Sequence, residues 1–373
     1  MERIFKRNSH NLKLFISIVC FFFTLISCEP SSSPSDSTNE NVNRIIAGRI
    51  IDEEGNGISD VKVTVGNKST NTNIDGIFKL SEVDIKSETF VINAEKLGYY
   101  TSHKRFFKES EATNVAIVLK AKELTAKFQS NQSYTHFYPD GSSITIPANS
   151  LAYEDSKQPF NGQVLMYSFI NSADDEDLAN NFPGDFSAQT ISGNITSLFS
   201  YGIHRVELFS QDGKKLNLAN GKKAKLTFPV PYDLQGIAPE EVPIWHYNIE
   251  KGIWEETFKA ILKGDFYETE VSHFSIVNLD YPSSNATIIV KVIDCNNNPL
   301  SGITVEILSK QGTTNANGEV RFIQVPTQMA PNQPSKIQIS ASGLLNGFLQ
   351  SNTVYINNLG QDETRLVTIT LRS

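Results

Sequence analysis

The chain contains an internal repeat. Residues 46–83 match residues 288–325 without a gap, at a constant offset of 242 positions, so that Asp52 corresponds to Asp294. Self-similarity of this length is typical of one supersecondary unit that is used more than once. Any fold for this chain must therefore give the two segments the same local structure.

Each copy has the pattern of alternating strands separated by turns. In the first copy Val61, Val63 and Val65 alternate with Lys62 and Thr64. Successive side chains of a β-strand point to opposite faces, so the valines share one face and the polar residues the other. The copies are therefore expected to form half-buried strands rather than helices.

The turns between these strands also indicate β-structure. Asp75-Gly76 in the first copy corresponds to Asn317-Gly318 in the second. Tight hairpins favour such pairs because glycine accepts a positive φ at little cost. Alternating strands joined by such turns predict an antiparallel β-sandwich in each copy.

This plan resembles the carboxypeptidase regulatory-like domain, a seven-stranded transthyretin-like sandwich. The likeness rests on G-x-V-x-D-x-x-G-x-P-L-x-G-V-x-V followed by T-x-x-x-G-x-F, and covers roughly residues 44–122 and 285–373. Residues 90–100 fit a further strand and turn of that family, whereas residues 325–334 and 340–344 of the second copy depart from it. In metallocarboxypeptidases the module holds no catalytic residue, so the resemblance implies a structural or binding role and not peptidase activity.

The middle of the chain, residues 123–282, has its own turn signals and no long amphipathic helical pattern. Strands are expected near residues 143–147, 162–169, 204–209 and 224–231. The order of its landmarks resembles the ZU-five type β-sandwich and the related middle domains of bacterial surface lipoproteins. The residues that carry this likeness are 140–151, 226–231, 244–247, 252–254 and 271–275.

The predicted fold class is therefore all-β, with tandem antiparallel β-sandwiches of transthyretin-like or Ig-like type. The expected domains are a signal peptide, a disordered tether and three sandwiches, at residues 1–27, 28–43, 44–122, 123–282 and 285–373.

The first residues have the pattern of an export signal. A basic stretch precedes an apolar run of about a dozen residues, 14–26, which ends at Ser27-Cys28. A retained transmembrane helix is disfavoured because spanning a bilayer takes about 20 apolar residues. Residues 25–28 resemble the bacterial lipobox, which implies that Cys28 is acylated and becomes the first residue of the mature protein. The alternative is a chance cysteine beside an ordinary cleavage site.

Residues 29–43 contain almost no apolar side chains, so they cannot bury enough surface to offset the entropy of ordering. They are expected to form a flexible tether between membrane and sandwiches. Removal of residues 1–27 takes away four basic residues and one acidic residue, which changes the formal net charge from −8 to −11. Nucleic acid and anionic lipid surfaces bind cationic proteins, so neither is an expected partner.

The sharpest chemical candidate is His273-Phe274-Ser275. Some members of the ZU-five group cleave themselves between Phe and Ser at this tripeptide. The Ser hydroxyl attacks the preceding carbonyl with a neighbouring His as base, and water resolves the ester. The reaction would need a strained peptide bond. The favoured alternative is structural, with these residues closing the last strand, Phe274 inward and Ser275 outward.

Metal sites are not predicted. No pair among the six histidines has zinc-like spacing. Asp174, Asp175 and Asp177 lie close enough to share a calcium ion, but the alternating ligand pattern of a calcium loop is missing, so a solvated loop is favoured. No cofactor motif is present. His246, between Trp245 and Tyr247, is expected in a core strand with a hydrogen-bonded structural role.

The roles of Cys295 and of a set of aromatic side chains can each be interpreted in two ways. Cys295 is the one free thiol of the mature chain, and we expect it to be buried or half-buried rather than nucleophilic. Aromatic side chains at 99–100, 106–107 and 134–138 can stack on sugar rings if exposed, or fill cores.

Together these observations predict a non-enzymatic, lipid-anchored protein of the cell envelope, in the outer membrane or at the cell surface, that acts as a binding or adhesion scaffold. The protein or glycan that it binds is not specified. Two alternatives remain, self-cleavage between Phe274 and Ser275 and a glycan-binding role in nutrient uptake.

Overall fold

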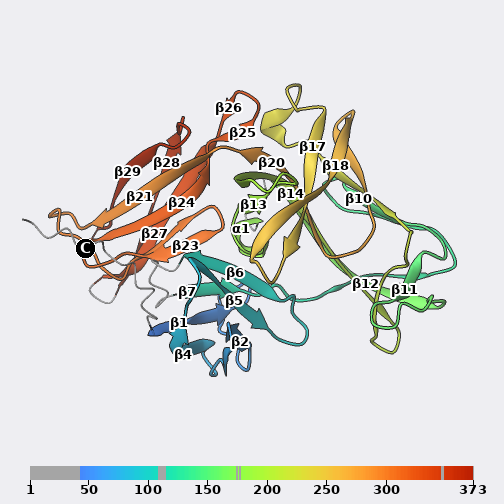
Figure 1. Cartoon of the computed structure of the whole chain (residues 1–373). Helices are drawn as coiled ribbons and strands as arrows, with labels where there is room; N and C mark the ends of the chain where they lie inside the picture. The colour runs from blue at the N-terminus through green and yellow to red at the C-terminus, as the bar shows by residue number, and fades with distance from the viewer. Residues whose placement is uncertain (1–42, 108–114, 174, 176–177, 346–347, 373) are drawn as a thin grey trace, which may run out of the picture. The chain divides into compact units, whose positions relative to one another are not determined.

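The computed structural model describes residues 43–107, 115–173, 175, 178–345 and 348–372. The regular secondary structure of this part of the chain is almost wholly β-strand (Figure 1); its α-helix α1 (Leu178–Asn181) and its 3-10 turn η1 (Tyr232–Leu234) are each less than two turns long. Within it, no helix is long and apolar enough to cross a membrane. The predicted fold class, all-β with tandem sandwiches, is confirmed.

The first repeat copy forms two sheets that face each other. One has the strand order β4-β1-β7 and the other β3-β2-β5-β6. Their strands are β1 (Asn43–Ile51), β2 (Lys62–Val65), β3 (Lys68–Asn71), β4 (Ile77–Asp84), β5 (Thr89–Glu95), β6 (Ser102–Phe107) and β7 (Val115–Val118). As the alternation predicted, Val61, Val63 and Val65 are all buried in the core between these sheets.

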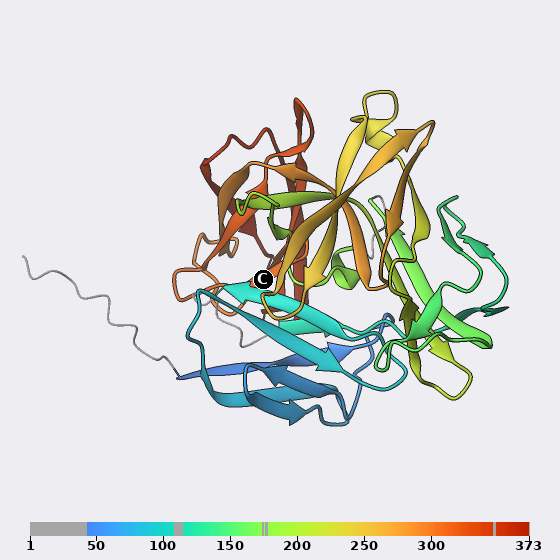
Figure 2. The same ribbon diagram turned by 45° about the vertical axis from the view of Figure 1, so that its right-hand side comes forward.

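The second copy has the matching arrangement, with sheets β24-β21-β29 and β23-β22-β27-β28 and a small hairpin, β25-β26. Figure 2 shows these strands in orange and red and the first copy in blue and cyan. Their bounds are β21 (Asn285–Ile293), β22 (Thr304–Ile307), β23 (Lys310–Thr313), β24 (Glu319–Pro326), β25 (Gln328–Ala330), β26 (Gln333–Pro334), β27 (Lys336–Leu345), β28 (Phe348–Asn357) and β29 (Thr364–Thr370).

The repeat extends to individual hydrogen bonds. The Thr72 hydroxyl donates to the Ile58 carbonyl at 2.6 Å, and Thr314 donates to the Leu300 carbonyl at 2.6 Å. The same hydroxyls accept the backbone N–H groups of Val61 and Ile303 at 2.9 and 3.0 Å. Each threonine lies just after one strand, β3 or β23, and ties it to the segment that leads into β2 or β22, at the same offset that the sequence shows.

The Asx-Gly turns also match. Gly76 and Gly318 have φ angles of +77° and +72°, and a Cβ atom there would lie 2.3 Å from the Ile50 carbonyl oxygen and 2.6 Å from that of Val292. No side chain fits at that distance, so glycine is required by close approach as well as by conformation.

One feature of these sandwiches differs from the antiparallel expectation. β1 pairs with β7 in parallel, and β21 pairs with β29 in parallel. Alternation of side chains is the same in both kinds of pairing, so the sequence pattern did not distinguish them.

The middle of the chain forms a thirteen-stranded sheet system that branches. Its strands are β8 (Leu124–Gln129), β9 (Tyr134–Phe137), β10 (Ser143–Ile146), β11 (Leu151–Tyr153), β12 (Gln163–Ser172), β13 (Ser187–Gln189), β14 (Ile195–Ser210), β15 (Lys215–Leu218), β16 (Ala224–Pro229), β17 (Glu241–Asn248), β18 (Ile253–Lys263), β19 (Phe266–Val271) and β20 (Ile276–Ser283). All four predicted strands are present, and the one expected near residues 204–209 is the end of the 16-residue β14.

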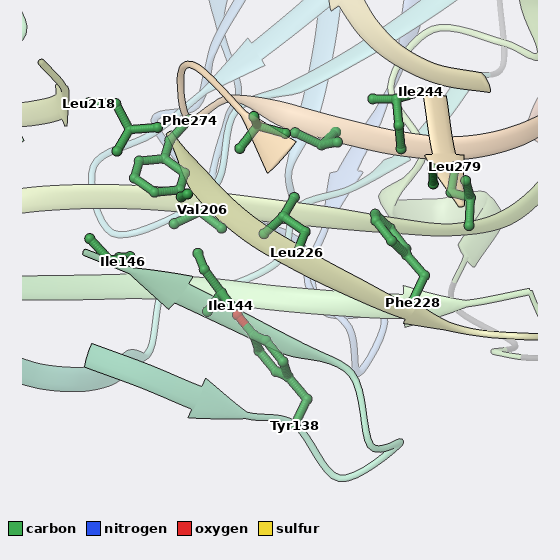
Figure 3. Close-up of a cluster of buried hydrophobic side chains, with 14 of the residues drawn as sticks. Tyr138, Ile144, Ile146, Val206, Leu218, Leu226, Phe228, Ile244, Phe274 and Leu279 are labelled. Carbon is green, nitrogen blue, oxygen red and sulfur yellow. The ribbon is translucent and has the colours of Figure 1, made fainter. Parts of the chain in front are cut away.

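β14 organises this sheet system because it pairs with β12, β13, β15 and β20 along its length. β20 in turn lies between β14 and β17. The side chains packed around them fill a core that includes Val206, Leu226, Phe228 and Leu279, as Figure 3 shows. Fully burying one such side chain stabilises a fold by about 1.5–3 kcal/mol.

Asp185 is a buried charge with two cationic partners. Lys310 Nζ donates to Asp185 Oδ2 at 2.7 Å, and Arg105 Nη1 donates to both carboxylate oxygens at 3.1 and 3.2 Å. Burial alone would raise the pKa of Asp185, but the two cations outweigh it and lower the pKa to about 2. The carboxylate thus ties β6 and β23 to the segment before β13.

A second buried carboxyl, Asp280, has no cationic partner within hydrogen-bonding distance among the described residues. Asn278 Nδ2 donates to Asp280 Oδ2, and Ser200 Oγ donates to Asn278 Oδ1 at 3.1 Å. Asp280 Oδ1 is buried with no hydrogen-bond partner in the described structure. Burial raises the pKa of Asp280 well above its ordinary value, and hydrogen bonds offset this only in part. The folded protein therefore holds Asp280 protonated where a free carboxyl would ionise.

This raised pKa predicts a pH-dependent loss of stability. An unfolded Asp loses its proton above about pH 4, whereas folded Asp280 keeps it, so the free energy of unfolding falls by up to about 1.4 kcal/mol per pH unit between the unfolded and folded pKa values. Asp280→Asn removes the titrating carboxyl and with it this pH dependence. The free energy of unfolding of Asp280→Asn, relative to that of wild type, should therefore increase as the pH rises. Urea unfolding at several pH values between acid and neutral measures it. The exposed Asp233→Asn is the control, and parallel curves for wild type and Asp280→Asn would contradict the prediction.

Candidate functional site

The tripeptide His273-Phe274-Ser275 lies in the short bend between β19 and β20. It therefore precedes the last strand of the middle sheet and does not close it, contrary to the structural alternative. Phe274 does point inward as expected: it is 5% exposed and packs in the core near Leu218 and Val206 (Figure 3). The Phe274 ring thereby fixes the position of the peptide bond that follows it.

The histidine that contacts Ser275 is His246 and not His273. His246 Nδ1 and Ser275 Oγ are 3.1 Å apart and share a hydrogen bond. The sheet register explains this proximity, because His246 on β17 pairs with Val277 on β20, two positions beyond Ser275. His246 is 8% exposed in a core strand, so its predicted hydrogen-bonded place there is confirmed.

His273 has a different place. Its ring packs against that of His246 with the centroids 4.3 Å apart and the planes tilted by 31°. Its side chain is exposed, and no hydrogen bond from His273 to Ser275 is present in the described structure. Adjacency in sequence thus did not identify the histidine that meets the hydroxyl.

Asn217 was not singled out from the sequence, yet it holds both polar groups of the Phe274 backbone. The Phe274 N–H donates to Asn217 Oδ1 at 2.7 Å, and Asn217 Nδ2 donates to the Phe274 carbonyl oxygen at 3.0 Å. β14 brings these residues together, since it pairs with both β15, which carries Asn217, and β20. The carbonyl that Ser275 would attack is therefore already hydrogen-bonded to an amide donor.

The electrostatics of His246 favour its neutral form. Burial, and secondarily the nearby His273, lower the pKa of His246 to about 3. Its Nε2 atom is buried without a hydrogen-bond partner in the described structure. The imidazole is thus unprotonated at neutral pH and free to accept a proton, but as a weak base.

A cavity of about 280 Å³ adjoins this group. Its lining includes Asn217, Phe274 and Ser275, together with Arg205 and Glu207. Such a space has room for water next to the peptide bond between residues 274 and 275.

Backbone strain of the kind expected for self-cleavage is absent from the φ angles. None of the five residues from Ser272 to Ile276 has a positive φ. A left-handed backbone conformation therefore contributes no strain at this bond.

The calcium hypothesis lies mostly outside the described residues, because Asp174 and Asp177 are not among them. Asp175 is described, and its Oδ2 accepts a hydrogen bond from Asn171 at 2.6 Å. Among the residues that the structure covers, no three His, Cys, Asp or Glu side chains are grouped as metal ligands. Cys28 also lies outside the described range, so its acylation stays a prediction.

The expectation for Cys295 is wrong, since its side chain is exposed. It lies in the turn after β21 and follows Asp294 in the sequence. The Asp294 carboxylate accepts hydrogen bonds from the backbone N–H groups of Asn296 and Asn298. The alternation that buries every second residue ends with the strand, and the turn leaves the thiol in solvent.

Most of the aromatic residues considered for sugar stacking fill cores. Tyr100, Phe106 and Tyr138 are 4%, 3% and 8% exposed. Tyr134 is half-buried and stacks on Phe128 at 4.4 Å between ring centroids. Of these candidates Phe137 is strongly exposed, at 72%, and a single ring makes no binding platform.

The described chain is thus a protein of tandem β-sandwiches, with a polar cluster around the peptide bond between Phe274 and Ser275. No protein-family model and no curated protein sequence matches the chain.

Solved structures that resemble it include the Bacillus anthracis TIE protein, with 10% identity and a TM-score of 0.19 over 88% of this chain and 50% of that one. BcpA, the major pilin subunit of Bacillus cereus, has 10% identity and a TM-score of 0.19 over 89% and 99%. A variant of the shaft pilin SpaA from Lactobacillus rhamnosus GG has 9% and 0.20 over 65% and 99%. The chain spans about half the length of the TIE structure, and at these TM-scores none of them defines a family for it.

The contacts of Asn217 predict its contribution to stability. Asn217→Ala leaves the N–H and the carbonyl of Phe274 without their partners, which should lower the free energy of unfolding by about 1–3 kcal/mol. Urea unfolding measures the loss. Asn220→Ala, at an exposed turn on the same connection, is the control, and equal stabilities of the two variants would contradict the assigned role.

Proposed function

We propose that the chain is a lipid-anchored protein of the cell envelope that acts as a non-enzymatic scaffold for binding or adhesion. In this proposal Cys28 carries the lipid, residues 29–43 form the tether, and the sandwiches present the binding surface. The proposed location is the outer membrane or the cell surface. The proposed partner is a protein or a glycan, because the acidic mature chain disfavours nucleic acid.

The observation that carries this proposal is the way the sandwiches are joined. The described residues, from 43 onward, belong to a single compact unit. Within it, the buried Asp185 carboxylate receives Arg105 from β6 and Lys310 from β23. Truncating one partner of such a buried ion pair costs about 3–5 kcal/mol. Strands from both repeat copies are thus fixed to the middle sheet, which supports a load-resisting spacer more than a set of independent domains.

Lipidation is tested directly by metabolic labelling. In cells grown with an alkyne analogue of palmitate, the wild-type protein should take up the label and Cys28→Ala should not. Cys295→Ala is the matched control, because it removes the other cysteine of the mature chain and should label like wild type. An unlabelled wild-type protein would overturn the anchor. In the same cells, digestion by external protease would support surface exposure, and full protection would place the chain inside the envelope.

A second candidate function, self-cleavage between Phe274 and Ser275, is favoured by a specific observation. The Ser275 hydroxyl is hydrogen-bonded to a neutral histidine, and the Phe274 carbonyl accepts a hydrogen bond from Asn217. A nucleophile, a base and a carbonyl donor therefore surround one peptide bond. No enzymatic turnover of another molecule is implied.

The pairing of β20 alters the consequence expected from such cleavage. A cut between Phe274 and Ser275 would break the chain between the proposed anchor and the C-terminal repeat. β20 begins at Ile276, one residue after Ser275, and pairs along its length with β14 and at its centre with β17. A cut would therefore leave the two pieces held together by a strand in the middle of a sheet.

This pairing predicts the behaviour of the cut protein. A fragment that starts at Ser275 should co-purify with the anchored part in native buffer and separate from it only in denaturant. Native size-exclusion chromatography followed by mass spectrometry of denatured material measures both. Protein that stays a single intact chain after long incubation would exclude self-cleavage, and a fragment released in native buffer would contradict the retention.

A further inference from the structure

β28 is the longest edge strand of the two repeat sandwiches. It ends the sheet β23-β22-β27-β28 and pairs with β27 along its 10 residues without a bulge. Within the described residues no other strand pairs with it. A free edge presents N–H and C=O groups that can pair with a strand of another chain. The other side of β28 is therefore a possible contact surface.

Two hydrogen bonds show which backbone groups of β28 point away from β27. Arg365 Nη1 donates to the Asn357 carbonyl at 2.8 Å, and the Thr353 N–H donates to the side chain of the preceding residue at 2.8 Å. Groups that point outward recur at every second residue of an antiparallel edge strand, so those of Ser351 and Tyr355 point outward too. In the described structure no hydrogen bond joins the outward N–H groups of Ser351 and Tyr355 to an acceptor.

β28 lacks the features that protect a free edge. Natural edge strands are short or bulged, or carry proline or charged side chains. Residues 337–361 contain no Asp, Glu, Lys or Arg, although 20% of the chain is charged, and β28 contains no proline. Each other described edge strand of the two sandwiches carries a charged residue or has at most four residues. With Leu349 and Tyr355 exposed at 73% and 60%, this edge is suited to contact with protein.

The first repeat copy shows what occupies the equivalent edge there. β6 takes the place of β28, since it ends the sheet β3-β2-β5-β6. The segment before β13 lies along β6: Gly184 forms a parallel bridge with Lys104, and its N–H donates to the His103 carbonyl at 2.5 Å. One copy of this sandwich thus already binds added backbone at its fourth strand, whereas the other copy has no such segment among the described residues.

We propose that two copies of this chain associate through β28, which pairs in antiparallel fashion with β28 of the second copy. The pairing joins two four-stranded sheets into one continuous sheet. It concerns association of the chain with itself and is independent of the external partner in the proposed function.

Charge favours a second copy as the occupant of this edge. The chain has a formal net charge of −8, so two copies repel each other over most of their surfaces. Segment 337–361 is uncharged, so a twofold contact through it brings no like charges opposite each other. Twofold symmetry also presents the same strand on both sides, which matches the two edges in length and in outward groups.

The open stretch of β28 is self-complementary. Arg365 closes the strand's end at Asn357, which leaves residues 349–355. Antiparallel pairing centred on this stretch sets Leu349 opposite Tyr355 of the second copy, and Ser351 opposite Thr353 of the second copy. Apolar side chains thus meet each other, and so do hydroxyls, which are favourable cross-strand pairs. The Thr353 N–H exchanges its side-chain acceptor for a backbone carbonyl.

Sedimentation of the purified full-length protein in detergent, over a range of protein concentrations, tests the proposal. The wild type should pass from monomer to dimer as the concentration rises. Thr353→Lys places a cation on the edge of each copy and should raise the dissociation constant about tenfold or more. Thr368→Lys, at an exposed threonine of edge strand β29, is the matched control and should associate like the wild type.

A mixing experiment separates a lost contact from a lost fold. Thr353→Asp should also be monomeric alone, because it places like charges near each other across the twofold axis. An equimolar mixture of Thr353→Lys and Thr353→Asp should form a heterodimer, since the substituted side chains then attract. A mixture that stays monomeric while both variants unfold in urea like the wild type would overturn the pairing.

The remaining outcomes also decide the proposal. A wild-type protein that is monomeric at every concentration overturns it. So does a dimer that Thr353→Lys leaves unchanged, or one that Thr368→Lys weakens equally, because the contact then lies elsewhere or depends on charge alone.

Discussion

The antiparallel pairing of β20 with β14 and β17 is the constraint on which the rest of the structure depends. It buries Asn278 and Asp280 in the sheet, where the Trp245 indole N–H donates to the Asp280 carbonyl at 3.0 Å. It places Ser275 at the start of the strand beside His246. At its other end, Ser283 Oγ accepts the N–H groups of residues 327 and 328, so the strand leads directly into the second repeat copy. One strand therefore joins the core, the candidate site and the C-terminal sandwich.

The sequence predicted the features whose residues lie close together along the chain. The alternation and the Asx-Gly pairs are local patterns, so they predicted the strands and turns of each copy. The contacts inside these turns were not predicted: the threonine after β3 or β23 bonds across 14 residues, and the Asp52 and Asp294 carboxylates each accept the N–H four residues later. The same alternation carried no information on the parallel pairs β1-β7 and β21-β29, whose partners are distant in sequence.

The candidate site was predicted in part for the same reason. His273, Phe274 and Ser275 are adjacent, so the tripeptide was visible in the sequence. The histidine and the amide that contact it come from β17 and β15, and no spacing relates His246 or Asn217 to Ser275 until the sheet register is known. The sequence placed His246 correctly in a core strand because it lies between Trp245 and Tyr247, but nothing local indicates which hydroxyl its ring will meet.

Burial in this sheet keeps two ionisable groups uncharged by shifting their pKa values in opposite directions. Desolvation lowers the pKa of His246 and raises that of Asp280, so the histidine is held without its proton and the carboxyl with it. The low pKa of His246 leaves its imidazole neutral at neutral pH beside the Ser275 hydroxyl, and the raised pKa of Asp280 leaves β20 without a buried negative charge.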